Sequence, residues 1–327
     1  MKIAVVGCGA VGSFYGAKLL AGGHETHFLL RSDYETVSKD GVRVQSAEGN
    51  FHIWPRPAIH PEEIGPCDLV LIGLKTTAND QFAHFLPPLT GASTLLLTLQ
   101  NGLGNELQLA QLFGEEGILG GLCFVCLNRT QPGVIHHLAH GHVTLGEFRK
   151  PAMQRTYQLA ETFRHARVSC DVTDDLERAH WEKLVWNIPF NGLGVASAAG
   201  YEAVVSGHVP IPVQLRPCLT TETLLRERPW EKLVSELMRE VIATANALGF
   251  PLPMTLADEN MDRTRIMGAY KPSTVIDFER GHRIELESLF LRPLACAIEA
   301  GIAAPRLAAL CEVLSVLDRT IGLARQS

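Results

Sequence analysis

The chain opens with a short strand pattern that runs directly into closely spaced glycines. Residues 2–7 read KIAVVG, and Gly7, Gly9 and Gly12 form the spacing GxGxxG ahead of an apolar helical pattern through Leu20. The first glycine lets the strand turn sharply, the second lets a pyrophosphate approach the backbone, and the third lets the helix pack against the strand. Unpaired amides at the helix start then face the phosphates. This order of strand, glycines and helix predicts a Rossmann domain that binds a dinucleotide.

The residues after the second expected strand decide which dinucleotide binds. That strand covers residues 25–30, and Arg31 and Ser32 follow it. NAD sites usually place a carboxylate here for the ribose 2′-hydroxyl, whereas a guanidinium suits a 2′-phosphate. We therefore expect NADPH, with Arg31 as the phosphate ligand. The alternative is that Arg31 is a solvated loop residue and that Asp33 binds the ribose.

Composition limits the function classes. The 327 residues are enough for two domains, and 46% hydrophobic with 20% charged residues is typical of a globular enzyme. The net charge of −6 and the absence of a basic cluster argue against nucleic-acid binding. No stretch approaches twenty uninterrupted apolar residues, so we expect no membrane span. The eight cysteines are scattered, which indicates reduced thiols and a cytoplasmic protein.

Two clusters that could hold a metal have simpler explanations. Cys123 and Cys126 lie in one apolar strand, where their odd spacing directs the thiols to opposite faces. Four histidines fall within residues 136–142, in a segment over 134–146 that resembles two short strands meeting at a Gly141 turn. We therefore expect no metal site.

Strands and helices alternate in the first half of the chain, and the nearly all-apolar strands predict a doubly wound parallel sheet. The expected strands are 2–7, 25–30, 68–74, 94–99 and 118–127, with helices at 10–21, 77–86 and 104–113. The segment 134–146 and a strand near 167–170 should complete this domain. From residue 174 the pattern is helical, over 174–190, 230–248, 257–268, 273–279, 284–299 and 304–324.

These patterns predict an α/β fold with an NADP-binding Rossmann domain at 1–173 and an all-α substrate and catalytic domain at 174–327. Between residues 199 and 228 the chain loses periodicity and gains prolines. We expect an irregular excursion there that could serve as a lid or as an oligomer contact, such as that of a homodimer.

Several polar residues occupy positions suited to chemistry. Lys75 and Asn101 each follow an expected strand, and the carboxyl ends of parallel strands border the ligand crevice of open α/β sheets. Lys183, Asn187 and Asn191 are spaced i, i+4 and i+8, so they share one helix face. The alternative is a solvated stripe in which the Lys183 stem covers apolar surface.

Two further features of the helical half concern the course and the start of its helices. Pro189 lies between the two asparagines, where it should free the Val185 carbonyl and kink the helix. Ser273 follows a proline at an expected helix start, and Thr274 and Asp277 have the spacing of a capping arrangement.

The ordered set of these motifs resembles the ketopantoate reductase (2-dehydropantoate 2-reductase) family, over essentially the full length. The residues that carry the resemblance are the glycine fingerprint, Lys75, Asn101, Lys183, Asn187, Asn191, Ser273, Asp277, Gly281 and Glu285. Pro189 and the proline-rich stretch depart from the pattern of the best-known members. Those members usually have an asparagine about ten residues after the position of Asn191, and in this chain that position falls near Tyr201.

The resemblance implies roles for individual residues. Lys183 would be the general acid, and Glu285 a second catalytic residue beside the cofactor. Substrate would be bound by Asn101, Lys183, Asn187, Asn191 and Ser273. The cofactor would be bound by Gly7, Cys8, Gly9, Ala10, Val11, Gly12, Arg31, Lys75, Asn101, Val125 and Glu285.

The implied activity is NADPH-dependent reduction of the C2 ketone of 2-dehydropantoate to pantoate, a step of pantothenate and coenzyme A biosynthesis. Hydride addition leaves negative charge on the carbonyl oxygen, so a positioned proton donor is needed there. Two alternatives stay open: a reductase of another branched 2-oxo acid, and a non-catalytic dinucleotide sensor whose helical half binds a partner.

Overall fold

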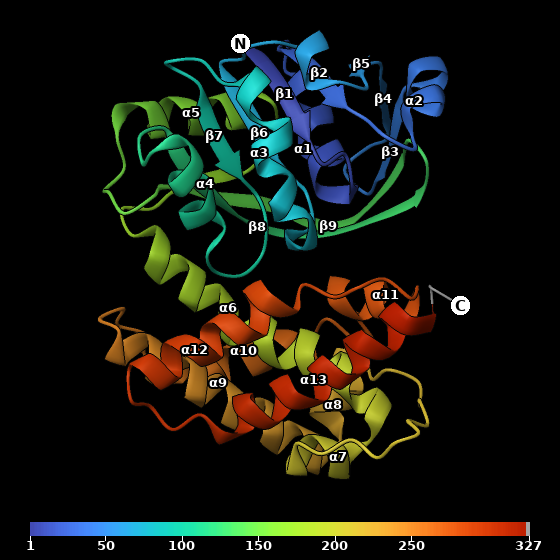
Figure 1. The fold of residues 1–327 in the computed structure, drawn as a ribbon, viewed down its shortest axis with the longest axis vertical. Helices are drawn as coiled ribbons and strands as arrows, with labels where there is room; N and C mark the ends of the chain where they lie inside the picture. The colour runs from blue at the N-terminus through green and yellow to red at the C-terminus, as the bar shows by residue number, and fades with distance from the viewer. Residues whose placement is uncertain (325–327) are drawn as a thin grey trace. The chain divides into compact units, whose positions relative to one another are not determined.

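The computed structural model describes residues 1–324, with side chains to Ile321, and the chain divides into two compact units. The first unit is Met1–Leu176 and the second begins at Glu177. Figure 1 shows strands and flanking helices in the first unit and helices in the second. This is the mixed α/β class that the sequence predicts.

A mixed sheet forms the centre of the first unit, and its described strands follow the order β4-β3-β9-β8-β7-β6-β1-β2-β5, with β10 paired to β9. The strands are β1 (Lys2–Val6), β2 (Glu25–Leu29), β3 (Val42–Ser46), β4 (Phe51–Ile53), β5 (Arg56–Ala58), β6 (Leu69–Ile72), β7 (Leu95–Thr98), β8 (Ile118–Gln131), β9 (Val134–Glu147) and β10 (Cys170–Val172). Strands β2, β1, β6, β7 and β8 run parallel to one another, so their carboxyl ends share one edge.

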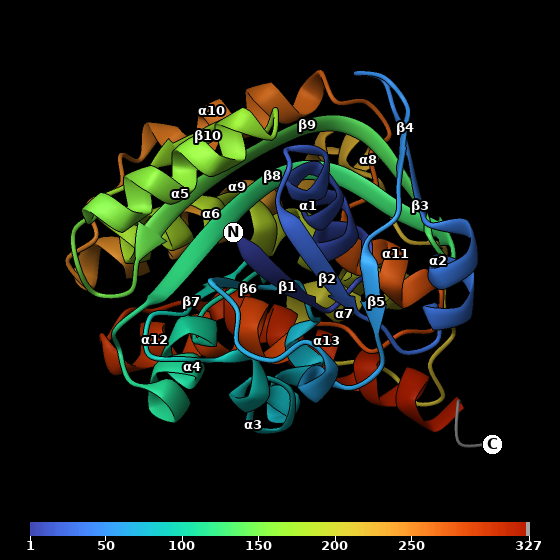
Figure 2. The same ribbon diagram turned by 90° about the horizontal axis from the view of Figure 1, so that it is seen from above.

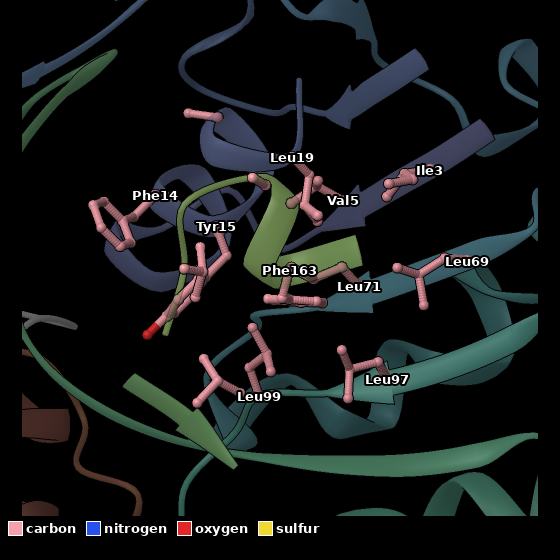
Figure 3. Packing of buried hydrophobic residues seen from close by; sticks show 14 of the residues in the cluster. Ile3, Val5, Phe14, Tyr15, Leu19, Leu69, Leu71, Leu97, Leu99 and Phe163 are labelled. Carbon is pink, nitrogen blue, oxygen red and sulfur yellow. The ribbon is translucent and has the colours of Figure 1, made fainter. Parts of the chain in front are cut away.

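Alternate side chains of the central parallel strands enter two separate cores. Ile3 and Val5 of β1 face α1 (Ala10–Ala21) and α5 (Gln154–His165), as Figure 3 shows for part of this cluster. Ala4 and Val6 belong to the opposite core with residues of α3 (Phe82–Phe85) and α4 (Asn105–Phe113). Because the side-chain period of a strand is two, helices on both faces require strands that are apolar throughout.

The remaining helical elements of the first unit are short: α2 (Tyr34–Asp40) and the turns Pro61–Glu63, Thr76–Gln81 and Pro87–Leu89.

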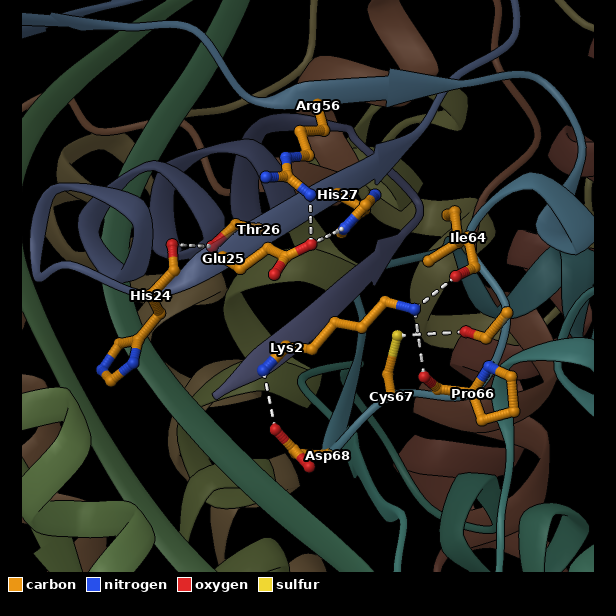
Figure 4. Close-up of polar contacts among 11 residues, drawn as sticks. Lys2, His24, Glu25, Thr26, His27, Arg56, Ile64, Pro66, Cys67 and Asp68 are labelled. Atoms are coloured by element: carbon orange, nitrogen blue, oxygen red, sulfur yellow. Dashed lines mark hydrogen bonds and ion pairs between the residues drawn. The ribbon is translucent and has the colours of Figure 1, made fainter.

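Structural hydrogen bonds tie together the amino-terminal edge of this sheet (Figure 4). The Lys2 amide donates to Asp68 at 2.7 Å, and the Lys2 ammonium donates to the Ile64 and Pro66 carbonyls. Glu25 pairs with His27 and Arg56, and the His27 hydrogen bond is the main reason that the pKa of Glu25 is lowered. The ionic groups at this end hold β1, β2, β5 and β6 together.

The expected turn at Gly141 is wrong. Strand β9 runs through this point and pairs antiparallel with β8 over almost its whole length, as the two long neighbouring strands in Figure 2 show. The pairing register shifts near His140 and Gly141, both of which have positive φ. A glycine that adopts positive φ serves a β-bulge as well as a chain reversal, so the sequence pattern did not distinguish them.

In the described residues, the regular structure of the second unit is entirely helical. Its helices are α6 (Leu176–Ala196, of which the first residue belongs to the first unit), α7 (Tyr201–Ser206), α8 (Thr221–Arg226), α9 (Arg228–Ala247), α10 (Thr255–Arg265), α11 (Ser273–Glu279), α12 (Arg292–Glu299) and α13 (Pro305–Ala324), with short turns at Ser197–Ala199 and Glu287–Leu291. Helix α13 packs against α7, α9 and α12, which makes α13 central to this core.

Residues 199–228 are more regular than the sequence predicts. Helices α7 and α8 occupy six residues each of this stretch, and the longer segment between them lacks regular structure. Each helix is six residues long, too short to establish a clear helical periodicity among the prolines. In the described residues, no helix has the length and apolar character needed to cross a membrane.

Candidate functional site

The glycine fingerprint forms a tight turn between β1 and α1. Gly7 has φ +94°, and a side chain there would meet the Leu74 backbone nitrogen at 2.2 Å. A Cβ on Gly12 would lie 2.2 Å from the Gly7 oxygen, so both positions exclude any larger residue. Ser13, which the sequence analysis did not select, donates its hydroxyl to the Cys8 carbonyl at 3.0 Å and fixes the turn.

Gly9 differs from the other two glycines because it faces open space. A Cβ built on it meets no atom within 4 Å. Gly9 is also the N-cap of α1, where no side chain caps the helix and no acidic residue occupies the first turn. The amides of this turn are therefore available to an anion, and a dinucleotide pyrophosphate fits this arrangement.

Lys75 and Asn101 lie at the same edge of the sheet as this turn. Lys75 follows β6 and is exposed, and Asn101 follows β7 and is half-buried. Since β1, β6 and β7 are parallel neighbours, their three carboxyl ends are adjacent. The structure thus brings the fingerprint and both polar residues to one sheet edge.

A network of amides that the sequence analysis missed joins the segments beside Lys75 and Asn101. The Gln100 amide donates to Asn79 at 2.7 Å, and Asn79 donates to Asn105 at 3.0 Å. Asn105 in turn donates to the Asn101 carbonyl at 3.1 Å. Scattered asparagines and glutamines carry no spacing signal in a sequence, because their partners lie on different elements.

The residues just after β2 are those expected to determine whether NADPH or NADH binds. Arg31 is exposed, whereas Asp33 is buried and forms an ion pair with Arg129 at 2.6 Å. Val125, which was expected to contact the cofactor, lies in the middle of β8. It is opposite His140 at the register shift, and it packs against the core as a half-buried residue.

The contacts of Cys8 and of the histidines in residues 136–142 are typical of residues with a structural role. Burial raises the pKa of the Cys8 thiol well above its ordinary value, with a further increase from Asp33, so the thiol stays protonated. The buried His137 ring contacts the Ser46 hydroxyl and the His140 carbonyl, both at 2.8 Å. Across residues 1–324, no group of three or more potential metal-ligating side chains is found.

In the second unit, α6 carries Lys183, Asn187 and Asn191, and it continues as a helix through Pro189. Lys183 is half-buried, and the two asparagines are 7% and 4% exposed. Asn191 is used structurally, because its amide nitrogen donates to the Asn187 carbonyl at 3.0 Å and its oxygen accepts the Thr274 amide at 3.3 Å. Among the described residues, the Asn187 side-chain amide has no hydrogen-bond partner.

The capping arrangement expected for Thr274 and Asp277 is wrong. Helix α11 begins after Pro272 without a side-chain cap, and Asn191 of α6 binds the Thr274 amide instead. This long-range contact could not be read from local spacing. The Thr274 hydroxyl is buried and lacks a partner in the described part of the chain, while Ser273 beside it is exposed.

Glu285 is 4% exposed and lies just ahead of the π-helical turn Glu287–Leu291. Asp318 of α13, which the sequence analysis missed, accepts hydrogen bonds from the Arg283 side chain at 2.6 Å and the Ile284 amide at 2.9 Å. Asp318 thereby fixes the backbone that leads to Glu285. Single π-turns often occur at functional sites.

Comparison with known proteins places this geometry in a family. The family model described as ketopantoate reductase PanE/ApbA matches residues 3–150, and its C-terminal counterpart matches residues 215–318. The 2-dehydropantoate 2-reductase of Nostoc sp. is 36% identical over 97% of this chain and 95% of its own length. The chain belongs to the ketopantoate reductase family.

Solved structures agree with this membership. The 2-dehydropantoate 2-reductase of Geobacter metallireducens is 44% identical, covers 97% of this chain and 99% of its own, and superposes with a TM-score of 0.88. The enzyme of the same name from Methylococcus capsulatus is 30% identical, covers 98% of both chains and gives a TM-score of 0.84. This ketopantoate reductase family member is an oxidoreductase that uses a nicotinamide dinucleotide and acts on a small keto acid.

Proposed function

We propose that this protein reduces the C2 ketone of 2-dehydropantoate to pantoate with NADPH. The observation that carries the proposal is the 36% identity to the Nostoc enzyme over 97% of the chain. The half-buried Lys183 and the buried Asn187, on one face of α6, agree with it.

At the carboxyl edge of its sheet, the first unit carries groups that suit the phosphates of NADPH. The uncapped amides at the start of α1 suit the pyrophosphate, and the exposed guanidinium of Arg31 suits the 2′-phosphate. Lys75 and Asn101 supply a cation and an amide at neighbouring strand ends. The bound cofactor supplies the hydride.

Lys183 acts as the proton donor in this proposal. As hydride reaches C2, negative charge develops on the ketone oxygen, and an ammonium group beside that oxygen stabilises the charge and gives up a proton. Asn187 and Ser273 then hold the carboxylate and hydroxyl of the substrate by neutral hydrogen bonds, which keep C2 in a reactive orientation. Asn191 acts through α11, whose first turn it fixes.

The proposal is tested by following NADPH oxidation with a panel of 2-oxo acids. We expect 2-dehydropantoate to give the highest kcat/KM, ahead of 2-oxoisovalerate and pyruvate, because its hydroxyl has polar partners in Asn187 and Ser273. A higher kcat/KM for another branched 2-oxo acid would assign that acid as substrate. Binding of NADPH without turnover of any 2-oxo acid would favour the dinucleotide sensor instead.

A further inference from the structure

A buried carboxylate lies two residues after Arg31. Asp33 is 5% exposed, and its carboxylate accepts hydrogen bonds from Arg129 at 2.6 Å and from the Ser32 hydroxyl at 3.0 Å. Arg129 comes from the far end of β8, and its side chain is 42% exposed. A carboxylate that is shielded from water is therefore held by a cation that still reaches solvent.

The end of β2, four residues before Asp33, borders the fingerprint turn. The Cys8 thiol lies 3.5 Å from the carbonyl of Leu29, the last residue of β2. The pKa of that thiol is raised mainly by burial, is raised further by Asp33 and is lowered by Arg129. Both charges of the pair thus act on the turn at which a dinucleotide would bind.

Asp33 and Arg31 have opposite preferences for the ribose. A carboxylate near the end of β2 accepts hydrogen bonds from a 2′-hydroxyl and repels a 2′-phosphate, whereas a guanidinium attracts the phosphate. The repulsion is strong near a buried carboxylate, because little water screens it. Arg129 offsets the Asp33 charge and donates to one of its oxygens, which would lessen this repulsion.

We propose that the Asp33–Arg129 ion pair sets the cofactor preference of this chain: Arg129 masks Asp33 and so allows Arg31 to accept a 2′-phosphate. This inference rests on the proposed use of NADPH and is independent of which 2-oxo acid is reduced. Arg129 is thus a positioning residue for cofactor choice, although it lies 96 residues from Asp33 in the sequence.

The test measures dissociation constants in the absence of any 2-oxo acid. NADPH and NADH are titrated by nicotinamide fluorescence, and 2′,5′-ADP and 5′-AMP by calorimetry, against wild type, Arg129→Gln, Asp33→Asn and the double variant. In Arg129→Gln we expect NADPH and 2′,5′-ADP to bind about tenfold more weakly or worse, because an unpaired buried carboxylate then faces the phosphate. Binding of NADH and 5′-AMP should stay the same or tighten.

The double variant separates masking from direct phosphate binding. If Arg129 only masks Asp33, removing the carboxylate as well should restore NADPH affinity to within about threefold of wild type. If the double variant binds NADPH as weakly as Arg129→Gln, or if Arg129→Gln weakens both cofactors equally, the proposal is wrong. Arg164→Gln is the matched control, because Arg164 pairs with Glu161 at the same 2.6 Å and is 41% exposed.

Asp33→Asn alone decides the question if Arg129→Gln fails to fold. The near-isosteric amide removes the charge, so NADPH should bind at least as tightly as in wild type. A loss of about tenfold would show that Asp33 is a cofactor ligand and would overturn the masking role. Because only binding is measured, failure to reduce 2-dehydropantoate would count against the proposed function and leave this inference intact.

Discussion

Lys183 is the residue on which the proposed chemistry depends most. Its half-buried position on α6 agrees with a proton donor, and the alternative of a lysine that only covers apolar surface makes a different prediction. Replacement by methionine keeps most of the side-chain volume and removes the charge, so it separates chemistry from folding.

We predict that Lys183→Met lowers kcat by about 10²–10⁴-fold, the range of a general acid, and leaves the dissociation constant of NADPH nearly unchanged. The check is steady-state kinetics combined with fluorescence titration of the cofactor. Lys232→Met is the matched control, since Lys232 is a largely exposed lysine of α9 paired with Glu236. Turnover of the Lys183 variant within about threefold of wild type would show that Lys183 only covers apolar surface and is not the proton donor.

A second prediction at this scale concerns Arg31 and the preference for NADPH over NADH. Loss of a charge-assisted contact should cost about 1.5–3 kcal/mol, which is roughly tenfold or more in affinity. We therefore predict that Arg31→Ala weakens NADPH strongly and NADH little, as measured by titration of both. Equal weakening of the two cofactors would mean that Arg31 does not contact the 2′-phosphate.

At the scale of elements, the turn between β1 and α1 combines two different constraints. Gly12 is required by packing, because a methyl group there would collide with the Gly7 oxygen. Gly9 has open space around it, so the protein itself does not need glycine at that position. The second glycine is free of a structural role and available for a ligand.

We predict that Gly9→Ala and Gly12→Ala fail in different ways. Gly9→Ala should keep the thermal unfolding temperature within a few degrees of wild type and lose NADPH affinity, because its methyl group occupies the space for the pyrophosphate. Gly12→Ala should unfold at a clearly lower temperature, since overpacking typically costs about 1–3 kcal/mol. A Gly9→Ala variant that binds NADPH normally would contradict the placement of the phosphates.

Local patterns predicted elements well and contacts between elements poorly. The strand at the start of the chain and helix α11 at 273–279 follow from periodicity and from glycine or proline signals. The Asn191 contact with the start of α11 spans 83 residues, and the Arg129 contact with Asp33 spans 96. Nothing in the neighbouring residues reports such contacts, so the sequence indicated Asn191 and Asp33 without their partners.

Gly141 illustrates a different limit. The sequence correctly indicated a backbone irregularity, yet a bulge within β9 and a turn between two strands use the same glycine. Only the partner strand β8 distinguishes them, because continuous pairing on both sides keeps β9 extended.

At the scale of the whole molecule, the proposal assigns cofactor binding to the first unit and substrate binding mainly to the second. The first unit carries the fingerprint, Arg31, Lys75 and Asn101, and the second carries Lys183, Asn187 and Ser273. Cofactor and substrate should therefore protect different parts of the chain.

We predict that NADPH alone slows amide hydrogen exchange in residues 7–13 and 99–105 of the first unit. Addition of pantoate to the NADP⁺-bound protein should further slow exchange in residues 270–274, which precede and begin α11. Mass spectrometry of peptides from both units checks this division. Protection by pantoate confined to the first unit would remove Ser273 from the substrate site.

The central claim is that hydride passes from NADPH to C2 of 2-dehydropantoate. We would incubate the protein with 2-dehydropantoate and NADPH deuterated at both C4 positions, and then locate the label in the product by NMR and mass spectrometry. The account predicts pantoate with one deuterium, bonded to C2. Recovery of unlabelled 2-dehydropantoate, or deuterium at any other carbon, would contradict it.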